Sequence, residues 1–404
     1  MAVALAHDVT EYFISRGTPV YACSLDAEGA FDSLPHAIMF QKTIGVIPDM
    51  FWRILVFWYS GLVVRIRWAG ILSRDIRIWK GTRQGGLSSP FMFNTFYKDL
   101  VQGLSDMQCG TKIDSATFNV FCYADDLLVT STTITGLQKL LDYAEHYIRT
   151  HGLRFNPTKT QCITFGKSKF SSRRWYLDGV ALEEVQRITY LGVTLSNDSG
   201  DHSNDRIKSA RRAFYALQGA GICDHGTSTE TLTHLYQAAI RPVLTYGLVC
   251  VHQNKAATDA IEKCQGNIVK TALGLSKFDK TSPLLNALRI NSISTTVEIQ
   301  QLALFRTMLL SSSRTGVFYK TILKENLLGI SSCRKDLVTH IRHTCQKHDV
   351  SLVRFLCDDK YGLAVKRQIK AFPVNDGVID SVKQLVSFRS MYNTQMLNLI
   401  LSPF

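Results

Sequence analysis

Two adjacent acids interrupt an apolar run and constrain the fold of this 404-residue chain more than any other feature. Asp125 and Asp126 lie in FCYADDLLVTS, residues 121–131, between segments typical of buried strands. Ionised carboxylates in such surroundings cost free energy unless a metal or another cation neutralises them. Taken alone, the pair favours a structural or capping role, and an ion site requires further acids nearby.

A third acid, Asp26, ends the alternating apolar run VYACSL (20–25). It lies 99 positions before Asp125 (125 − 26), so only a shared sheet brings the two together. A strand over 20–26 beside a hairpin over 118–130 places all three carboxylates at one side of that sheet. Because converging carboxylates repel one another, divalent cations would lie between them, and hard oxygen ligands select Mg²⁺ or Mn²⁺. Two such ions can stabilise both oxygens of an in-line phosphoryl displacement.

Periodicity divides the chain into an α+β part and a helical part. Apolar spacing predicts helices over 1–16, 88–106 and 134–152. The segment VVRIRWAGILSRDIRIWKG (63–81) alternates apolar and basic residues, as a β-hairpin with one charged face does. Strand signals end before the turn-rich run NDSGDHSND, which marks a boundary near 198–204.

The net charge indicates the kind of binding partner, and the cysteine content indicates the cellular compartment. The net charge of +13 predicts an anionic partner, most commonly nucleic acid, although a merely basic soluble protein has the same balance. The ten cysteines include no pair at the C-x2-C spacing of a zinc module. Free thiols in this number favour a reducing compartment, and we expect an intracellular protein of nucleus and cytoplasm. No 18-residue apolar window predicts a membrane span. The Cys and His residues between 333 and 357 favour a basic helix over a metal site.

Five segments in this order and spacing resemble motifs A to E of reverse transcriptases of non-LTR (LINE-type) retrotransposons: DAEGAFDSLPH (26–36), GTRQGGLSSPFMFN (81–94), FCYADDLLV (121–129), GLRFNPTKT (152–160) and ITYLGVTL (188–195). The resemblance implies a right-hand polymerase. We expect an α+β palm with partial fingers over 1–198, its antiparallel sheet covered by helices on one face. A helical thumb over 199–275 and a helical C-terminal region over 276–404 would follow.

The resemblance assigns roles around the acids. Asp26, Asp125 and Asp126 match the catalytic metal-binding carboxylates, and the carbonyl of Ala27 would add a ligand. Phe31 matches the gate that excludes a ribose 2′-hydroxyl and favours deoxynucleotides, although a core phenylalanine would need no such role. Asp32 is expected to cap the helix that follows.

Further positions match the substrate-binding motifs. Gln84 and Gly85 match the pair that lines the nucleotide and template pocket. Lys159 would protonate the leaving pyrophosphate or neutralise its charge, although an exposed turn lysine needs no role. Tyr190-Leu191-Gly192 resembles the hairpin that grips the primer.

Two basic clusters follow, KSKFSSRR (167–174) and RIKSARR (206–212). In the second, Lys208, Arg211 and Arg212 share one helix face, which suits contact with duplex phosphates, although a solvated face would look the same.

The first hypothesis is therefore an RNA-directed DNA polymerase that uses Mg²⁺ and dNTPs to extend a DNA primer on an RNA template. LINE-type enzymes place a fingers region before motif A, whereas 25 residues precede Asp26 here, so we expect an N-terminally truncated chain. The alternative is a non-catalytic nucleic-acid-binding remnant without the fingers needed for dNTP binding. An RNA-dependent RNA polymerase is disfavoured by Phe31. The sequence leaves the oligomeric state open.

Overall fold

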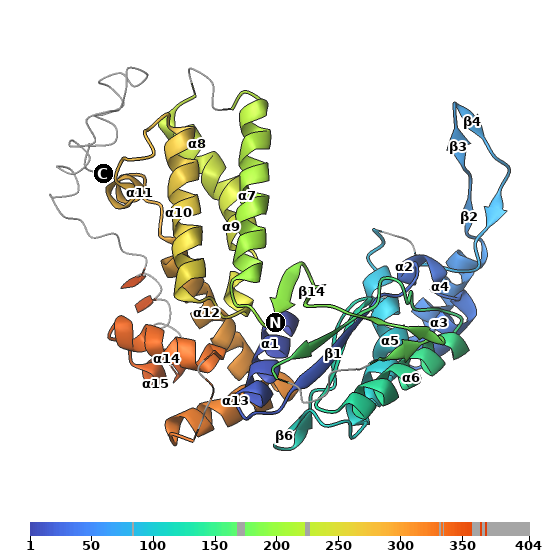
Figure 1. The fold of residues 1–404 in the computed structure, drawn as a ribbon. Helices are drawn as coiled ribbons and strands as arrows, with labels where there is room; N and C mark the ends of the chain where they lie inside the picture. The colour runs from blue at the N-terminus through green and yellow to red at the C-terminus, as the bar shows by residue number, and fades with distance from the viewer. Residues whose placement is uncertain are drawn as a thin grey trace. The chain divides into compact units, whose positions relative to one another are not determined.

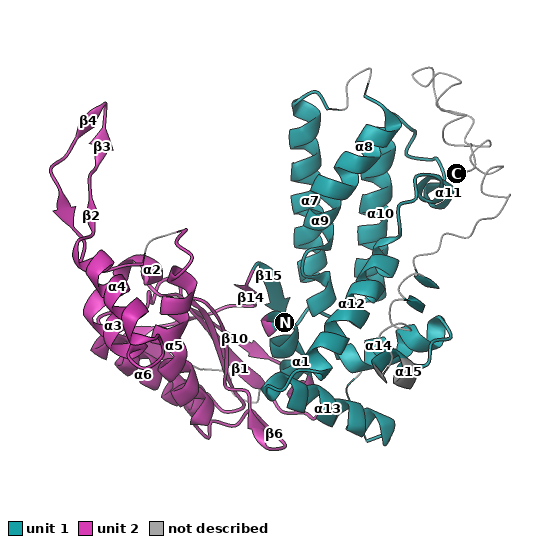
Figure 2. Ribbon diagram, turned by 180° about the vertical axis from the view of Figure 1, so that it is seen from behind, with its two compact units in different colours: residues 1, 3–11, 192–404 teal, residues 2, 12–191 magenta. Residues whose placement is uncertain are grey.

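The computed structural model describes residues 1–82, 85–167, 174–222, 227–330, 333, 335–357, 364–365 and 368–369 (Figure 1). It divides the chain into two compact units (Figure 2). Unit 2 contains residues 2 and 12–191, and unit 1 contains residues 1, 3–11 and 192–404. None of the described helices is long and apolar enough to cross a membrane.

A five-stranded sheet forms the centre of unit 2, in the order β13-β10-β1-β9-β8. Its strands are β1 (Val20–Leu25), β8 (Val120–Tyr123), β9 (Asp126–Ser131), β10 (Gln161–Phe165) and β13 (Glu183–Glu184). β1 pairs antiparallel with both β9 and β10, which confirms the expected strand beside a hairpin. The expected purely antiparallel sheet is wrong at one position, because the short strand β13 pairs parallel with β10.

Four helices complete the core of unit 2: the last two in sequence pack against the sheet, and the first two pack onto neighbouring helices (Figure 1). They are α3 (His36–Thr43), α4 (Asp49–Ser60), α5 (Ser89–Asp106) and α6 (Ile134–Thr150). On α6 the fully buried Leu137, Leu140, Leu141, Ala144 and Ile148 recur at helical spacing, so one stripe packs inward. The Thr133 hydroxyl accepts a hydrogen bond from Gly136 N–H and fixes the start of this helix.

The alternating segment after α4 forms the predicted hairpin. Its strands are β2 (Val63–Val64), β3 (Arg67–Trp68), β4 (Ile71–Leu72) and β5 (Ile76–Arg77), with β2 paired to β5 and β3 to β4. Ala69 and Gly70 at the tip both have positive φ, 47° and 85°, as a two-residue hairpin turn requires. Further hairpins join β6 (Lys112–Ile113) to β7 (Ala116–Thr117) and β11 (Tyr176–Leu177) to β12 (Val180–Ala181).

Unit 1 is largely helical after residue 200, as the loss of strand signals predicts. Its elements are β15 (Val193–Ser196), α7 (Asp201–Gly219), α8 (Thr229–Leu235), a π-helix (Tyr236–Ile240), α9 (Arg241–Thr245), α10 (Lys255–Ala272), α11 (Thr281–Ala287), α12 (Ile293–Leu309), α13 (Arg314–Leu327), α14 (Leu337–Lys347) and α15 (Leu352–Cys357). The division of this region into a thumb and a C-terminal region stays a prediction.

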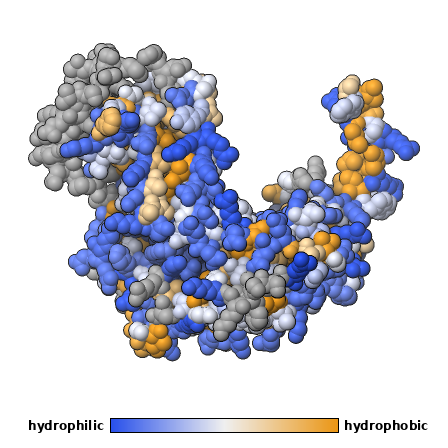
Figure 3. Space-filling view, viewed as in Figure 1, coloured by the Kyte–Doolittle hydropathy of each residue, from blue (hydrophilic) through white to orange (hydrophobic). Residues whose placement is uncertain are grey.

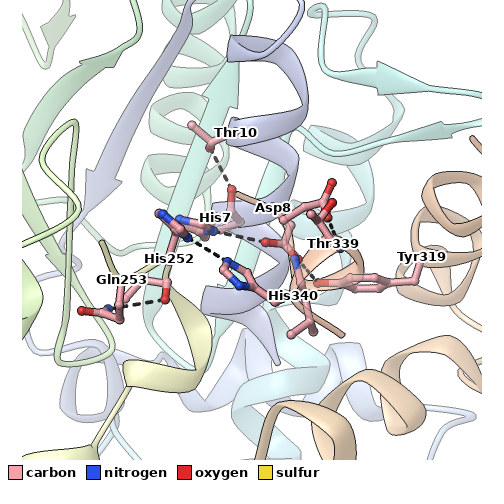
Figure 4. Close-up of polar contacts among 12 residues, drawn as sticks. His7, Asp8, Thr10, His252, Gln253, Tyr319, Thr339 and His340 are labelled. Atoms are coloured by element: carbon pink, nitrogen blue, oxygen red, sulfur yellow. Dashed lines mark hydrogen bonds and ion pairs between the residues drawn. The ribbon is translucent and has the colours of Figure 1, made fainter. Parts of the chain in front are cut away.

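Helix α1 (Ala2–Ile14) lies mainly in unit 1, together with residues 192–404. The buried Asp8 carboxylate accepts hydrogen bonds from the Tyr319 hydroxyl, at 2.7 Å, and from Leu337 N–H, at 3.3 Å (Figure 4). Nearby, His252 Nδ1 lies 2.8 Å from His340 Nε2. These contacts satisfy a buried acid through residues more than 300 positions away, which no local pattern encodes.

Candidate active site

The strand register brings two of the three acids together. β1 and β9 pair Leu25 with Leu127, and one further step along the same antiparallel register sets Asp26 opposite Asp126. Opposed residues of an antiparallel pair have Cα atoms about 5 Å apart. Asp125 adjoins Asp126 in the turn between β8 and β9, whose last pair is Tyr123 with Asp126. The three acids therefore gather at one end of the central strands.

The turn that presents the acid pair is strained. Ala124 has φ 53°, the left-handed region that alanine rarely occupies and that costs roughly 1–2 kcal/mol. Such outliers persist where surrounding structure fixes them, and they concentrate at functional sites. Sequence reasoning missed this feature because glycine, not alanine, is the usual signal for positive φ.

The acids influence one another electrostatically. The pKa of Asp126 is raised, first by burial and then by the negative charges of Asp125 and Asp26. Burial, together with the charges of Asp125 and Asp126, also raises the pKa of the Cys122 thiol to about 11. One cation lies close: Lys159 Nζ is 3.7 Å from an Asp26 carboxylate oxygen, and both side chains are substantially exposed.

Two buried tyrosine hydroxyls beside the acids have no hydrogen-bond partner among the described residues: those of Tyr97 on α5 and Tyr190 on β14 (Arg187–Tyr190). Burial raises the pKa of Tyr97, and Asp125 raises it further. Burial likewise raises the pKa of Tyr190, with contributions from Cys122 and Asp126. An unsatisfied buried hydroxyl costs about 1–3 kcal/mol, so both are donors held ready beside the carboxylates. The sequence singled out Tyr190 but not Tyr97.

The segment around Lys159 is tied to Asp26 by backbone hydrogen bonds. Asn156 N–H donates to the Asp26 carbonyl at 2.7 Å, and Glu28 N–H donates to the Arg154 carbonyl at 2.9 Å. These two bonds flank an isolated bridge between Ala27 and Phe155. In a pair flanked in this way, the Ala27 carbonyl points away from Phe155 and does not bond to it.

Phe31 begins a series of stacked rings that ends near the acids. Its ring stacks on Phe93 at a centroid distance of 4.3 Å, and Phe93 stacks on Tyr97 at 4.5 Å. Phe31 is only partly buried, so one side of its ring remains accessible. Asp32 lies inside the short helix α2 (Ala30–Ser33), whereas the N-cap of α3 is Pro35, so the expected side-chain cap on α3 is wrong.

The structure describes some of the remaining predicted substrate-binding residues but not all of them. Gln84 lies outside the described residues. Gly85 has φ 78°, a conformation that favours glycine, and none of the described residues crowds it. Leu191 and Gly192, with φ 50° and 72°, form the turn between β14 and β15.

The predicted duplex-binding residues lie in unit 1. Lys208, Arg211 and Arg212 are exposed on α7, and Arg211 partly offsets the burial that raises the pKa of the Cys264 thiol. The other basic cluster is described only at Lys167 and Arg174, and residues 168–173 lie outside the described part of the chain.

The donor chemistry at the acids fits a hard divalent cation. Three carboxylates and the Ala27 carbonyl are oxygen donors of the kind that Mg²⁺ takes, and the charges of Asp125 and Asp26 add to burial in raising the pKa of Asp126. As the side chains stand, no three His, Cys, Asp or Glu residues among those described are arranged to hold a metal ion.

Comparison with known proteins agrees with this geometry. The profile of the family described as "Reverse transcriptase (RNA-dependent DNA polymerase)" matches residues 5–195. The polyprotein of retrotransposable element R2DM from Drosophila melanogaster is 32% identical over 44% of this chain, which covers 18% of that protein. The R2 polyprotein from Popillia japonica is 27% identical over 58% of the chain, covering 39% of its length.

The RNA-directed DNA polymerase of the mobile element jockey, from Drosophila melanogaster, is 25% identical over 55% of the chain, which covers 25% of that protein. The chain thus spans less than two fifths of each of these three relatives. A solved telomerase from Candida tropicalis aligns with 96% of the chain and 50% of its own, at 11% identity and a TM-score of 0.36, too low to support an argument about fold. The motifs, the palm-like sheet and these relatives agree: residues 5–195 match the reverse transcriptase family, and the relatives are proteins of retrotransposable and mobile elements.

Proposed function

We propose that this chain is an RNA-directed DNA polymerase that adds deoxynucleotides to the 3′-hydroxyl of a DNA primer on an RNA template. The observation that carries the proposal is the register that sets Asp26 opposite Asp126, with Asp125 in the adjoining turn. A reverse transcriptase domain with its acids so gathered has the donors that phosphoryl transfer requires.

The acids are proposed to hold Mg²⁺, with Mn²⁺ as a substitute. Asp26, Asp125 and Asp126 supply carboxylates, and Ala27 supplies its carbonyl. When bound, two such ions stabilise the attacking and leaving oxygens of the transferred phosphoryl group. The unpartnered hydroxyls of Tyr97 and Tyr190 support this assignment, since each can donate to a carboxylate and hold its orientation.

Other residues are proposed to position the substrates. Phe31 excludes the 2′-hydroxyl, because its stack on Phe93 and Tyr97 keeps it from swinging aside. Lys159, 3.7 Å from Asp26, neutralises or protonates the leaving pyrophosphate. Gln84 and Gly85 line the nucleotide and template pocket.

Further contacts are proposed for the primer and the duplex. Tyr190, Leu191 and Gly192 grip the primer end, and their successive positive-φ residues give the tight turn such a contact needs. Lys208, Arg211 and Arg212, exposed on one face of α7, bind phosphates of the duplex.

Primer extension tests the proposal. The chain is incubated with a labelled DNA primer annealed to an RNA template, dNTPs and Mg²⁺, and products are resolved by length. Extension that stops when Mg²⁺ is chelated supports polymerase activity. Binding of the primer–template without extension would instead support a non-catalytic nucleic-acid-binding protein.

A further inference from the structure

A charged ribbon extends outward from the body of unit 2 (Figures 1 and 2). This ribbon, residues 61–80, contains five basic residues and one acid, a net charge of +4 (5 − 1). The acid, Asp75, pairs with Arg65. Among the described residues, no carboxylate pairs with the other four, which are Arg67, Arg74, Arg77 and Lys80.

The two faces of the ribbon differ. Residues directly opposite in a hairpin share a face, and alternate residues along a strand do so too. One face is apolar and includes the pairs Val64–Ile76 and Trp68–Ile71. The opposite face carries the arginines, in the pairs Val63–Arg77 and Arg67–Leu72. Figure 3 shows apolar residues along the ribbon with hydrophilic ones beside them.

An exposed aromatic ring lies on the basic face. Trp79 is two residues beyond Arg77, so the two side chains point the same way. The Arg77 guanidinium lies 5.9 Å from the Trp79 ring centroid, and Trp79 is 64% exposed. A flat ring among unpaired arginines is the combination that binds unstacked bases and phosphates of a single strand.

The base of the ribbon is bonded to the segment that carries Phe31. Trp79 carbonyl accepts a hydrogen bond from His36 N–H at 3.1 Å, and Gly81 N–H donates to the Leu34 carbonyl at 2.8 Å. Thr82 N–H then donates to the carbonyl of Phe31 itself at 2.7 Å. A nucleic-acid strand that lies along the basic face would therefore reach the segment of Phe31, which is proposed to contact the nucleotide.

Building on the proposed function, we propose that the basic face of the ribbon binds the single-stranded RNA template ahead of the acid site. Arg67 and Arg77 contact its phosphates, and Trp79 stacks on a base. Duplex product offers no unstacked bases to Trp79, and the ribbon precedes the segment in which Gly85 is proposed to line the nucleotide and template pocket. The single-stranded template fits both the charge and the ring.

The test is equilibrium binding of primer–templates that differ only in their 5′ template overhang. One overhang has about 3 nucleotides, too few for a usual single-strand site, and the other has about 15, enough to fill one. Fluorescence anisotropy is measured without nucleotides, so the result does not depend on whether the chain polymerises. The double substitution Arg67→Ala/Arg77→Ala should flatten the salt dependence of long-overhang binding by about 1.4 in log–log slope, from two contacts at about 0.7 each.

Trp79→Ala should weaken long-overhang binding by about tenfold. Neither variant should change binding of the short-overhang substrate. Two controls match them: Lys98→Ala/Lys112→Ala removes two exposed charges elsewhere in unit 2, and Ile66→Thr/Ile71→Thr alters the apolar face of the same ribbon. Both controls should bind like the parent chain.

Three outcomes would overturn the proposal. An equal loss for both substrates would assign the arginines to the duplex, and no loss for either would remove the contact. A loss in the Ile66→Thr/Ile71→Thr variant alone would make the apolar face the docking surface. Thermal unfolding of each variant excludes a folding defect as the cause.

Discussion

Asp126→Asn should make the metal-free protein more stable while removing a metal ligand. Asn is nearly isosteric with Asp, so the change removes charge and little else. In the structure the negative charges of Asp125 and Asp26 help to raise the pKa of Asp126. At neutral pH these two charges therefore repel the ionised Asp126 carboxylate and destabilise the folded state. Removing one of three like charges relieves that repulsion.

The size of the effect follows from the register. With opposed residues about 5 Å apart, Coulomb energy is about 3 kcal/mol at an effective dielectric constant near 20 and about 0.8 kcal/mol in water. Because Asp26 is 42% exposed and Asp126 is also exposed, screening favours the lower value, about 1 kcal/mol. For a unit of this size that corresponds to a rise in Tm of about 2–4 °C.

Thermal unfolding is measured in chelator and at increasing Mg²⁺, with Asp142→Asn on the exposed side of α6 as the matched control. The parent chain should gain stability with Mg²⁺, by about 2.7 kcal/mol at a concentration one hundred times the Kd, and Asp126→Asn should gain less. A lower Tm of Asp126→Asn in chelator, or an undiminished response to Mg²⁺, would refute the reasoning.

Three further predictions follow from single residues. Phe31→Ala should raise ribonucleotide incorporation relative to deoxynucleotide by about ten- to hundredfold, and an unchanged ratio in single-nucleotide extension would remove the gate assignment. Ala124→Gly should raise stability to thermal unfolding by about 1 kcal/mol, because glycine relieves the positive φ, and a loss of stability would show that the turn is unstrained. Burial, His340, Lys335 and His7 together lower the pKa of His252 to about 4, whereas in the unfolded chain the pKa stays near 6.5. The unfolded state therefore takes up the proton first, so stability falls as pH drops from about 6.5 to 4, by about 1–2 kcal/mol after screening. His252→Gln should flatten that pH dependence, and an unchanged slope would contradict it.

Local periodicity predicted most of the elements that position the candidate site. The alternation of VYACSL and of the segment around the acid pair identified β1, β8 and β9, and their pairing then required Asp26 and Asp126 to approach. The charged hairpin over 63–81 was likewise evident from alternation, because both its faces are exposed and its pattern is undisturbed by packing.

Features that depend on long-range contacts were not predictable in this way. Helix α1 lies mainly in unit 1 because Asp8 meets Tyr319 and Leu337, whose positions no local rule connects. Strand β13 pairs parallel with β10 over only two residues. It has no apolar alternation from which a strand could have been predicted. From the sequence alone, Tyr97 is indistinguishable from the other core residues of α5. Only the fold shows that its hydroxyl lies near Asp125 and has no hydrogen-bond partner among the described residues.

The most direct test of the central claim is single-turnover primer extension by the parent chain and by Asp125→Asn, on an RNA template with dNTPs and Mg²⁺. The same Asp142→Asn variant serves as control, and binding of the primer–template is measured in parallel. The account predicts extension by the parent and the control, and a loss of about a thousandfold or more in Asp125→Asn with binding retained. Extension by Asp125→Asn at the parental rate would contradict the assignment of the acids to catalysis.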